Sequence, residues 1–458
     1  MKKINLPKKV WWIVGIATLC LVAIILTLIG SMMSADGYFR RRAVSMKTEN
    51  FTVTDQMMTY YMYNMAQNYQ QKYSDTVNID LEKSLKKQQY TTDKTWYDYF
   101  AEQCKTDLRQ VLLFCEKATE QGMTITDDER KDIDEYIQTA NISLYQKAFG
   151  MNKDDLRQMV ELQYLYTKMY KKNMDSITVT TGEMDTYYAD HQKEFQKIAY
   201  RAFAIPYGSS AWYKTAEDAE KIAKDVAKAD TEEVFKNNIA YVLGSLGAGA
   251  DDVTNELQDG LYTDVAYKEG SKFLTWAFDA QRKVYDTFID SIDGAYIVYQ
   301  LQTLPLRDNG EQRNVRHILL SAATYYTESG MREKADEILK TFKQNGGTEE
   351  AFKKLADEHN EDSSTASTGG LYENVGKGET LDTFDAWTFD ASRKAGDTGV
   401  ITTAYGMHVM YYIGEGLAKW QEDVKSVIVQ NKLEAFCKEY EQTWPLTVKN
   451  GHIQRLPL

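Results

Sequence analysis

The pattern of hydrophobic and polar positions divides the chain into four stretches. Residues 10–33 are predominantly apolar and carry no charge. From about residue 50 to 195, apolar positions recur every three or four residues, which predicts amphipathic helices. From about residue 198 onward, short apolar runs alternate with helical patterns, which predicts strands alternating with helices. A last amphipathic helix begins near Trp420 and is stopped by Pro445.

The first apolar stretch is long enough to cross a membrane. There is no charged residue between Lys9 and Asp36. As a helix, residues 10–33 would measure about 36 Å, against a hydrocarbon core of about 30 Å. The stretch is longer than a signal-peptide core, and no small-residue cleavage site follows it. We therefore expect an uncleaved anchor. The charges on its two sides favour neither orientation strongly, but the stretch resembles a bacterial signal-anchor, and this resemblance implies residues 1–9 in the cytoplasm and the bulk of the chain extracytoplasmic.

The helical stretch is unusually rich in tyrosine and methionine. Examples are "TYYMYNMAQNYQQKY" at 59–73 and "LQYLYTKMY" at 162–170. Flexible methionine and amphipathic tyrosine side chains form adaptable apolar surfaces that suit binding of many sequences. The same residues also suit an ordinary helix core. Residues 34–195 are therefore predicted to form an all-α region, and its role as a binding surface stays open at this point.

An internal repeat organises the second half of the chain. The segment "GLYTDVAYKEGSKFLTWAFDAQRKVYDT" at 260–287 returns as "GLYENVGKGETLDTFDAWTFDASRKAGDT" at 370–398. The repeat predicts two copies of one α+β domain, at 196–305 and 312–416. Residues 417–458 then form a C-terminal helix and tail, whose apolar face we expect to pack on the helical region.

Two histidines distinguish the copies. His317 lies in "NVRHILLSA", an otherwise apolar run, and a buried imidazole there needs a hydrogen-bond partner. Alignment of the copies places Ala202 at the position of His317 and Tyr296 at that of His408. Both histidines are missing together from the first copy although its scaffold residues remain. Packing of the fold therefore does not require them, which indicates a joint functional role.

Composition excludes several other classes of function. The chain has 54 Lys and Arg against 67 Asp and Glu, a net charge of −13, and no basic stripe, so a nucleic-acid partner is not expected. Cys104 and Cys115 would lie about 16 Å apart along one helix, too far for a disulfide. No spacing of His or Cys suggests a metal site, and no phosphate-binding loop or nucleophile motif occurs. We expect neither a metal nor a cofactor.

These motifs, taken in order, resemble those of a parvulin-type peptidyl-prolyl cis/trans isomerase domain. The resemblance runs across 315–414, through "VRHILL", "TEEAFKKLADEHNEDSSTASTGG" and "FDAWTFDASRKAGDTGVITTAYGMHVM". The chain as a whole is similar to the membrane-anchored SurA/PrsA/PpiD-type extracytoplasmic foldases, which combine a helical chaperone region with one or two parvulin domains. The resemblance implies a multidomain protein whose first parvulin-like domain, 196–305, is degenerate.

The resemblance also implies a set of site residues. The catalytic residues would be His317, Asp362 and His408. The substrate-binding residues would be Leu371 and Phe384 in the proline pocket, with Thr403 and Tyr405 beside the histidines. This sequence has "GGLY" where the family usually has "GGDLG", and the usual pocket methionine falls near Thr380 or Leu381.

The expected function is that of a membrane-anchored foldase. It would bind unfolded or newly secreted polypeptides and isomerise their X–Pro bonds, whose rotation barrier of about 18–20 kcal/mol makes exchange slow enough to limit folding. Two alternatives stay open from the sequence: a non-catalytic holdase chaperone, and a secretion-associated scaffold that docks partner proteins.

Overall fold

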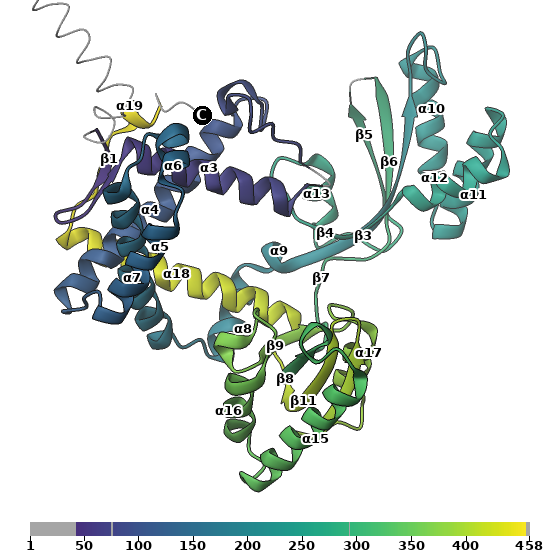
Figure 1. Cartoon of the computed structure of the whole chain (residues 1–458). Helices are drawn as coiled ribbons and strands as arrows, with labels where there is room; N and C mark the ends of the chain where they lie inside the picture. Colours follow the sequence, from purple (N-terminus) through teal and green to yellow (C-terminus); the bar gives the residue numbers. More distant parts are fainter. Residues whose placement is uncertain (1–42, 75–76, 293, 455–458) are drawn as a thin grey trace, which may run out of the picture. The chain divides into compact units, whose positions relative to one another are not determined.

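The computed structural model describes residues 43–74, 77–292 and 294–454 of the 458-residue chain (Figure 1). They form two compact units. The helical unit comprises the chain up to Thr178 and from Val429 onward, and the sheet unit comprises Val179–Ile428. The predicted anchor at 10–33 lies outside the described residues. Among the residues that are described, no helix has the length and apolar character needed to cross a membrane.

The helical unit contains most of the predicted amphipathic helices, but the helices at Thr181–Asp190 and Gln192–Phe195, which fall within the predicted region 34–195, belong to the sheet unit. Threonine or asparagine side chains cap the amino ends of α3, α4, α5 and α7 by accepting backbone hydrogen bonds that the first turn leaves unpaired. The elements in chain order are β1 (Val44–Lys47), β2 (Thr52–Thr54), α3 (Asp55–Lys72), η1 (Leu85–Lys87), α4 (Trp96–Glu120), α5 (Asp127–Thr139), α6 (Ile142–Phe149), α7 (Lys153–Ser176), the end of α18 (Lys419–Thr443), β12 (Thr447–Val448) and α19 (Asn450–Ile453).

The expectation of an all-α region is wrong in one respect. Strands β1, β2 and β12 form an antiparallel sheet in the order β12-β1-β2, in which Met46 pairs with both Val53 and Val448. These strands are only two to four residues long. Such short strands are too brief to show a period-two pattern, and one of them lies at the far end of the sequence.

The second half of α18 packs in the helical unit. Its apolar face shares a core with α4 and α7, made of Leu113, Phe114, Ala118, Met169, Leu433, Cys437, Tyr440 and Trp444. The Arg109 guanidinium of α4 also lies 2.8 Å from carboxylate oxygens of both Glu434 and Glu441. The first half of α18 belongs to the sheet unit, where Trp420 and Val424 pack against Met184.

The sheet unit begins with α8 (Thr181–Asp190) and α9 (Gln192–Phe195) and continues into two sheet domains. The first sheet domain, residues 196–307, has the strand order β4-β3-β6-β5, with β7 also paired to β3. Its elements are β3 (Gln196–Pro206), α10 (Ala216–Val226), α11 (Glu232–Ser245), α12 (Ala250–Asp259), β4 (Leu261–Ala266), α13 (Lys272–Ala277), β5 (Thr287–Ile292), β6 (Ala295–Leu301) and β7 (Leu306–Arg307).

The second sheet domain, residues 312–415, has the matching strand order β9-β8-β11-β10. Helices α15 and α16 contact β11 and β8, and α17 contacts β10. Its elements are β8 (Gln312–Ser321), α14 (Ala322–Tyr325), α15 (Glu328–Gln344), α16 (Glu349–His359), η2 (Ala366–Thr368), β9 (Leu371–Gly376), α17 (Asp382–Thr388), β10 (Thr398–Thr403) and β11 (Gly406–Glu415).

Strand register corrects one detail of the sequence alignment. Ala202 pairs with Tyr299, as His317 pairs with Met410. The residue two positions before each partner is then Ile297 in the first domain and His408 in the second.

Ile297, and not Tyr296, is therefore the counterpart of His408. Tyr296 pairs with Ile205, and both belong to the core that α10 and α11 cover. The assignment of Tyr296 came from aligning "DGAYIV" at 293–298 with "YGMHVM" at 405–410, which matches Gly294 to Gly406. Gly294, however, lies in the turn before β6, whereas Gly406 is the first residue of β11.

Candidate active site

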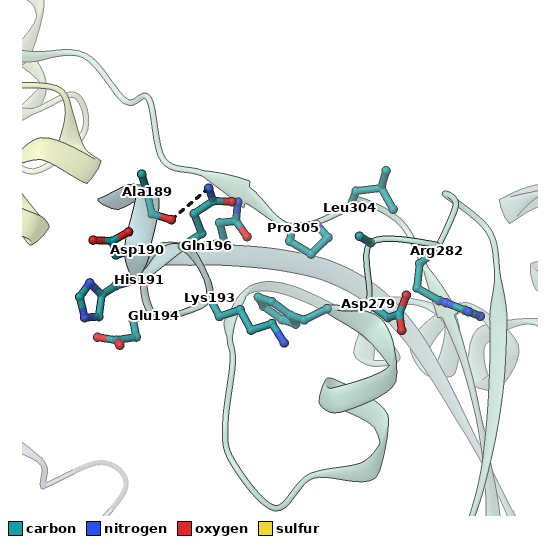
Figure 2. A pocket seen from close by; sticks show the side chains of 13 residues that line it. Ala189, Asp190, His191, Lys193, Glu194, Gln196, Asp279, Arg282, Leu304 and Pro305 are labelled. Carbon is teal, nitrogen blue, oxygen red and sulfur yellow. Dashed lines mark hydrogen bonds between the residues drawn. The ribbon is translucent and has the colours of Figure 1, made fainter. Parts of the chain in front are cut away.

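Two pockets of similar size lie among the described residues of the sheet unit. One, with a cavity volume of about 660 Å3, lies where α9 leads into β3 (Figure 2). Its charged side chains are of both signs, and its His191 follows the last residue of α8, with Nδ1 2.9 Å from the carbonyl oxygen of Tyr187 in that helix. The other, of about 590 Å3, lies in the second sheet domain and is lined by His317 and His408. The second pocket is the candidate site.

Strand geometry explains the histidine in the apolar run. Successive side chains of a strand point to opposite faces of the sheet. Ile318 and Leu320 therefore enter the core beneath α15 and α16, while His317 faces the side that α17 covers. His408 on the neighbouring β11 faces the same side, and only 2% of His317 and 6% of His408 are exposed.

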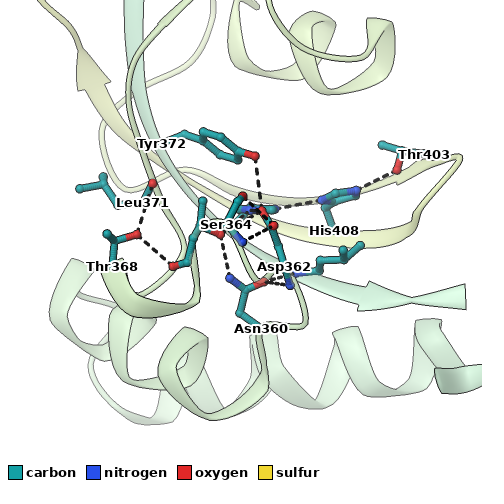
Figure 3. Close-up of polar contacts among 11 residues, drawn as sticks. Asn360, Asp362, Ser364, Thr368, Leu371, Tyr372, Thr403 and His408 are labelled. Atoms are coloured by element: carbon teal, nitrogen blue, oxygen red, sulfur yellow. Dashed lines mark hydrogen bonds and ion pairs between the residues drawn. The ribbon is translucent and has the colours of Figure 1, made fainter. Parts of the chain in front are cut away.

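Four side chains form one chain of hydrogen bonds across the pocket (Figure 3). His317 Nδ1 lies 3.0 Å from His408 Nδ1, and His317 Nε2 lies 3.0 Å from Asp362 Oδ2. At the other end, Thr403 Oγ1 lies 2.8 Å from His408 Nε2.

The carboxylate assigns every proton in this chain. An ionised carboxylate only accepts, so His317 must donate from Nε2, and its Nδ1 then accepts from the Nδ1–H of His408. The Nε2 of His408 is left to accept from the Thr403 hydroxyl. The hydrogen-bond network thus assigns one neutral tautomer to each ring.

The loop between α16 and β9 positions Asp362. Asn360 holds the loop to β8, because its Oδ1 accepts from Leu319 N at 2.9 Å while its Nδ2 donates to Thr365 Oγ1 at 2.9 Å. Thr365 Oγ1 in turn lies 3.0 Å from Asp362 Oδ2. Ser364 contributes both its hydroxyl, at 2.7 Å, and its backbone N–H, at 3.0 Å, to Asp362 Oδ1.

A glycine allows this loop to meet the strand. His317 N donates to the Gly370 carbonyl oxygen at 2.8 Å. A Cβ on Gly370 would lie 2.0 Å from the His317 carbonyl oxygen, and the residue has φ +72°. Only glycine adopts this conformation at such close approach without strain.

The electrostatics keep both rings neutral and the carboxyl ionised. Burial lowers the pKa of His317, although Asp362 opposes this effect. Burial, and then the neighbouring His317, lower the pKa of His408 to about 4. For Asp362, burial acts to raise the pKa, but hydrogen bonds from Ser364 and Thr365 outweigh it and lower the pKa to about 2.

The pocket walls are partly those expected. Phe384 is buried, and its ring centroid lies 5.7 Å from that of His317 and 5.9 Å from that of His408. Thr403 and Tyr405 also line the pocket, with Tyr405 at the rim, where 66% of it is exposed. The Thr403 hydroxyl accepts from Tyr405 N at 3.2 Å in addition to contacting His408.

Leu371, which was expected in the proline pocket, does not line it. Leu371 pairs with Arg316, whose side chain binds Glu349 on the helix-covered side of the sheet. The next residue of β9, Tyr372, lines the pocket instead. In Figure 3 its ring lies over the site, and its hydroxyl is 3.3 Å from Asp362 Oδ2.

Sequence reasoning missed Tyr372, Asn360 and Thr365. The "GGLY" segment offers two adjacent apolar residues, and strand alternation requires that only one of them face the pocket. That alternation was the available signal for Tyr372. Asn360 and Thr365 lie in a loop, where no periodicity marks which side chains point inward. Within the described residues, no group of three or more His, Cys, Asp or Glu could hold a metal ion.

Comparison with known proteins gives a family for this domain. Residues 299–413 match the family described as "PPIC-type PPIASE domain", the parvulin-type peptidyl-prolyl isomerases. "Foldase protein PrsA 1" of Listeria monocytogenes serotype 4b is 28% identical over 123 residues, covering 26% of this chain and 37% of that protein. The same figures hold for the protein of that name from Listeria innocua serovar 6a. The match therefore spans little more than a third of these relatives' length.

Among solved structures, PrsA from Bacillus subtilis is 16% identical, covering 82% of this chain and 94% of that one, with a TM-score of 0.29. The peptidylprolyl isomerase PrsA from Bacillus anthracis is 18% identical, covering 50% of this chain and 88% of that one, with a TM-score of 0.20. The family match coincides with the strands and loops that build the histidine pocket. Residues 299–413 of this chain therefore form a domain of the parvulin peptidyl-prolyl isomerase type.

Proposed function

We propose that the second sheet domain catalyses cis/trans isomerisation of X–Pro peptide bonds at the histidine pocket. The observation that carries this proposal is the placement of an ionised carboxylate, Asp362, beside an aromatic wall formed by Phe384 and Tyr372. The aromatic wall suits a proline ring. The carboxylate then lies at the edge of the pocket, next to the amide that precedes the ring.

Isomerisation requires loss of amide resonance. The planar amide is stabilised by a charge-separated form that places negative charge on the carbonyl oxygen, and its loss accounts for a barrier of about 18–20 kcal/mol. A fixed negative charge near that oxygen disfavours the charge-separated form. A pocket that excludes water also removes the hydrogen bonds that stabilise it. Both effects favour the twisted state over the planar ones.

In this proposal the histidines are positioning residues. The pKa of each histidine is lowered, so at neutral pH both rings are neutral and neither is an imidazolium that could act as an acid. His317 holds Asp362 through Nε2, and His408 fixes the tautomer of His317. Thr403 completes the chain by satisfying the last ring nitrogen. The arrangement stabilises one orientation of the carboxylate.

We further propose that the whole protein is a membrane-anchored extracytoplasmic foldase for unfolded or newly secreted polypeptides. Three observations support this: the apolar stretch at 10–33, the tyrosine- and methionine-rich helical unit, and the relatives named as foldases. In that assignment the helical unit binds clients and the second sheet domain acts on their X–Pro bonds.

The test is an isomerase assay with matched variants. We expect the protein to accelerate X–Pro exchange in a short peptide, measured by NMR exchange spectroscopy. Asp362→Ala and His408→Ala should each lower kcat/KM at least about tenfold while the circular dichroism spectrum is unchanged. Asp252→Ala in the first sheet domain is the control and should have no effect, because Asp252 caps its own helix by accepting from Gly249 N at 3.1 Å.

Two outcomes would contradict the proposal. Unchanged turnover in both site variants would show that the pocket is not the active site. Exchange no faster than the uncatalysed rate in the unmodified protein would favour the non-catalytic holdase.

A further inference from the structure

We propose that the histidine pocket selects X–Pro bonds in which X, the residue before proline, is lysine or arginine. This inference rests on the proposed function and adds its substrate class. Three carboxylates line the pocket: Glu361, Asp362 and Glu379. Among the described residues that line it, none is lysine or arginine. The site is therefore a proline pocket with uncompensated negative charge.

The two glutamates are held at the rim by the backbone. Glu361 Oε2 accepts from Ser321 N at 2.7 Å, at the end of β8. Glu379 Oε2 accepts from Gly376 N at 2.9 Å, in the turn between β9 and α17. Each hydrogen bond uses one carboxylate oxygen and leaves the other able to meet a ligand. Both side chains are exposed, and neither has an ion-pair partner among the residues that the structure describes.

Substrate geometry places X at this rim. If the proline ring lies against Phe384, the amide that rotates lies beside Asp362, and residue X precedes that amide. Extended residues are spaced by at most about 3.6 Å, so X lies next to Asp362 and near Glu361, its neighbour in the loop. A long cationic side chain on X reaches the free carboxylate oxygens, whereas a glutamate or phosphoserine at X meets like charge.

The expected selectivity is electrostatic and therefore depends on salt. At low ionic strength we expect kcat/KM for a Lys-Pro peptide to exceed that for the matched Glu-Pro peptide by about tenfold. Exposed charges are screened over about 3 Å at 1 M salt, so the ratio should fall towards one there.

The experiment compares three peptides that differ only at X, with alanine, lysine or glutamate. The readout is the Lys:Glu ratio of kcat/KM, which is insensitive to any general loss of activity. The double variant Glu361→Gln, Glu379→Gln should lower the ratio at least threefold. Glu373→Gln is the matched control, because Glu373 is an exposed carboxylate of β9 that does not line the pocket. It should leave the ratio unchanged.

The outcomes separate this inference from the proposed function. Acceleration of Ala-Pro exchange with a Lys:Glu ratio within twofold of one would overturn the inference and leave the isomerase intact. A ratio that survives in the double variant would also overturn it, since selectivity would then arise elsewhere. If the unmodified protein accelerates none of the three peptides, the proposed function itself fails.

Discussion

The two sheet domains share a frame, by which we mean the same strand order and the same contacts between the first strand and the chain around it. They differ on one face of the sheet. In both, an arginine of the first strand binds a glutamate, Arg201 to Glu232 at 2.9 Å and Arg316 to Glu349 at 3.0 Å. In both, the next residue donates its N–H to a glycine carbonyl, at 2.9 Å in the first domain and 2.8 Å in the second. These contacts join the strand to the chain that precedes the next strand.

The face of the sheet that holds the histidine pocket in the second domain has different residues in the first. The first domain has Ala202 and Ile297 in place of the histidines. Its helix α12 replaces the loop that carries Asp362. Phe273, the counterpart of Phe384 in the repeat, stacks on Tyr299 with ring centroids 4.0 Å apart, so an aromatic ring of the domain itself packs at this position. The comparison teaches that the frame folds without the site, and that site residues can therefore be altered while the fold is kept.

The largest expected effect comes from replacing the glycine that contacts the first strand in each domain, Gly370 or Gly260. Gly370→Ala places a Cβ 2.0 Å from a backbone oxygen at φ +72°, so we expect the second domain to lose about 3 kcal/mol or more, and its activity with it. Gly260→Ala meets Ala202 O at 2.8 Å with φ −75°, and should cost the first domain about half as much. Hydrogen exchange of β8 and β3 amides measures each effect separately. Equal losses of unfolding free energy in the two domains would contradict the expectation that the chain approaches the strand more closely at Gly370 than at Gly260.

A smaller expected effect is a pH dependence of the free energy of unfolding that only the second sheet domain should show. A histidine whose pKa is lower in the folded state binds fewer protons folded than unfolded. The free energy of unfolding of the second domain should therefore fall as the pH is lowered from about 6.5 towards 4, by about 2 kcal/mol.

Replacing the pair by the first domain's residues, His317→Ala with His408→Ile, should remove this fall. The measurement is hydrogen exchange of β11 amides between pH 4 and 7, corrected for the intrinsic exchange rates. The same slope in the double variant would mean that other groups titrate in this window. The pKa of Asp362 is lowered from 3.8 to about 2, so its own contribution to stability is lost mainly below pH 4.

The smallest expected effect concerns Tyr372. Tyr372→Phe keeps the aromatic wall and removes a hydroxyl 3.3 Å from the Asp362 carboxylate. Because that contact is long and the carboxylate keeps its other donors, we expect kcat to fall about two- to threefold with KM nearly unchanged. Tyr262→Phe, at the matching place in β4, should leave turnover unchanged. A rise in KM alone would show that Tyr372 acts in binding only.

Sequence patterns predicted the architecture more completely than they predicted the details of the site. Periodicity predicted the amphipathic helices, and the internal repeat predicted two domains whose strand orders match. The histidines could be found because the repeat supplies a built-in comparison. The residue of the first domain that is equivalent to His408 was assigned one position too early, as Tyr296 and not Ile297. The cause is that Gly294 lies in a turn, whereas Gly406, to which it was aligned, lies in a strand. Leu371 was carried over from the family resemblance, whereas Tyr372, the next residue of the strand, is the one that lines the pocket.

The stacked ring in the first domain has a consequence for the thermodynamics of the second. In the first sheet domain, the ring of Tyr299 already packs on Phe273 in the absence of any ligand. Where Phe384 borders a cavity of about 590 Å3, part of the apolar packing is left for a substrate to supply. A proline-containing chain that fills it binds the folded state and not the unfolded one. Substrate concentration is therefore coupled to the stability of the second sheet domain, and the first is indifferent to it.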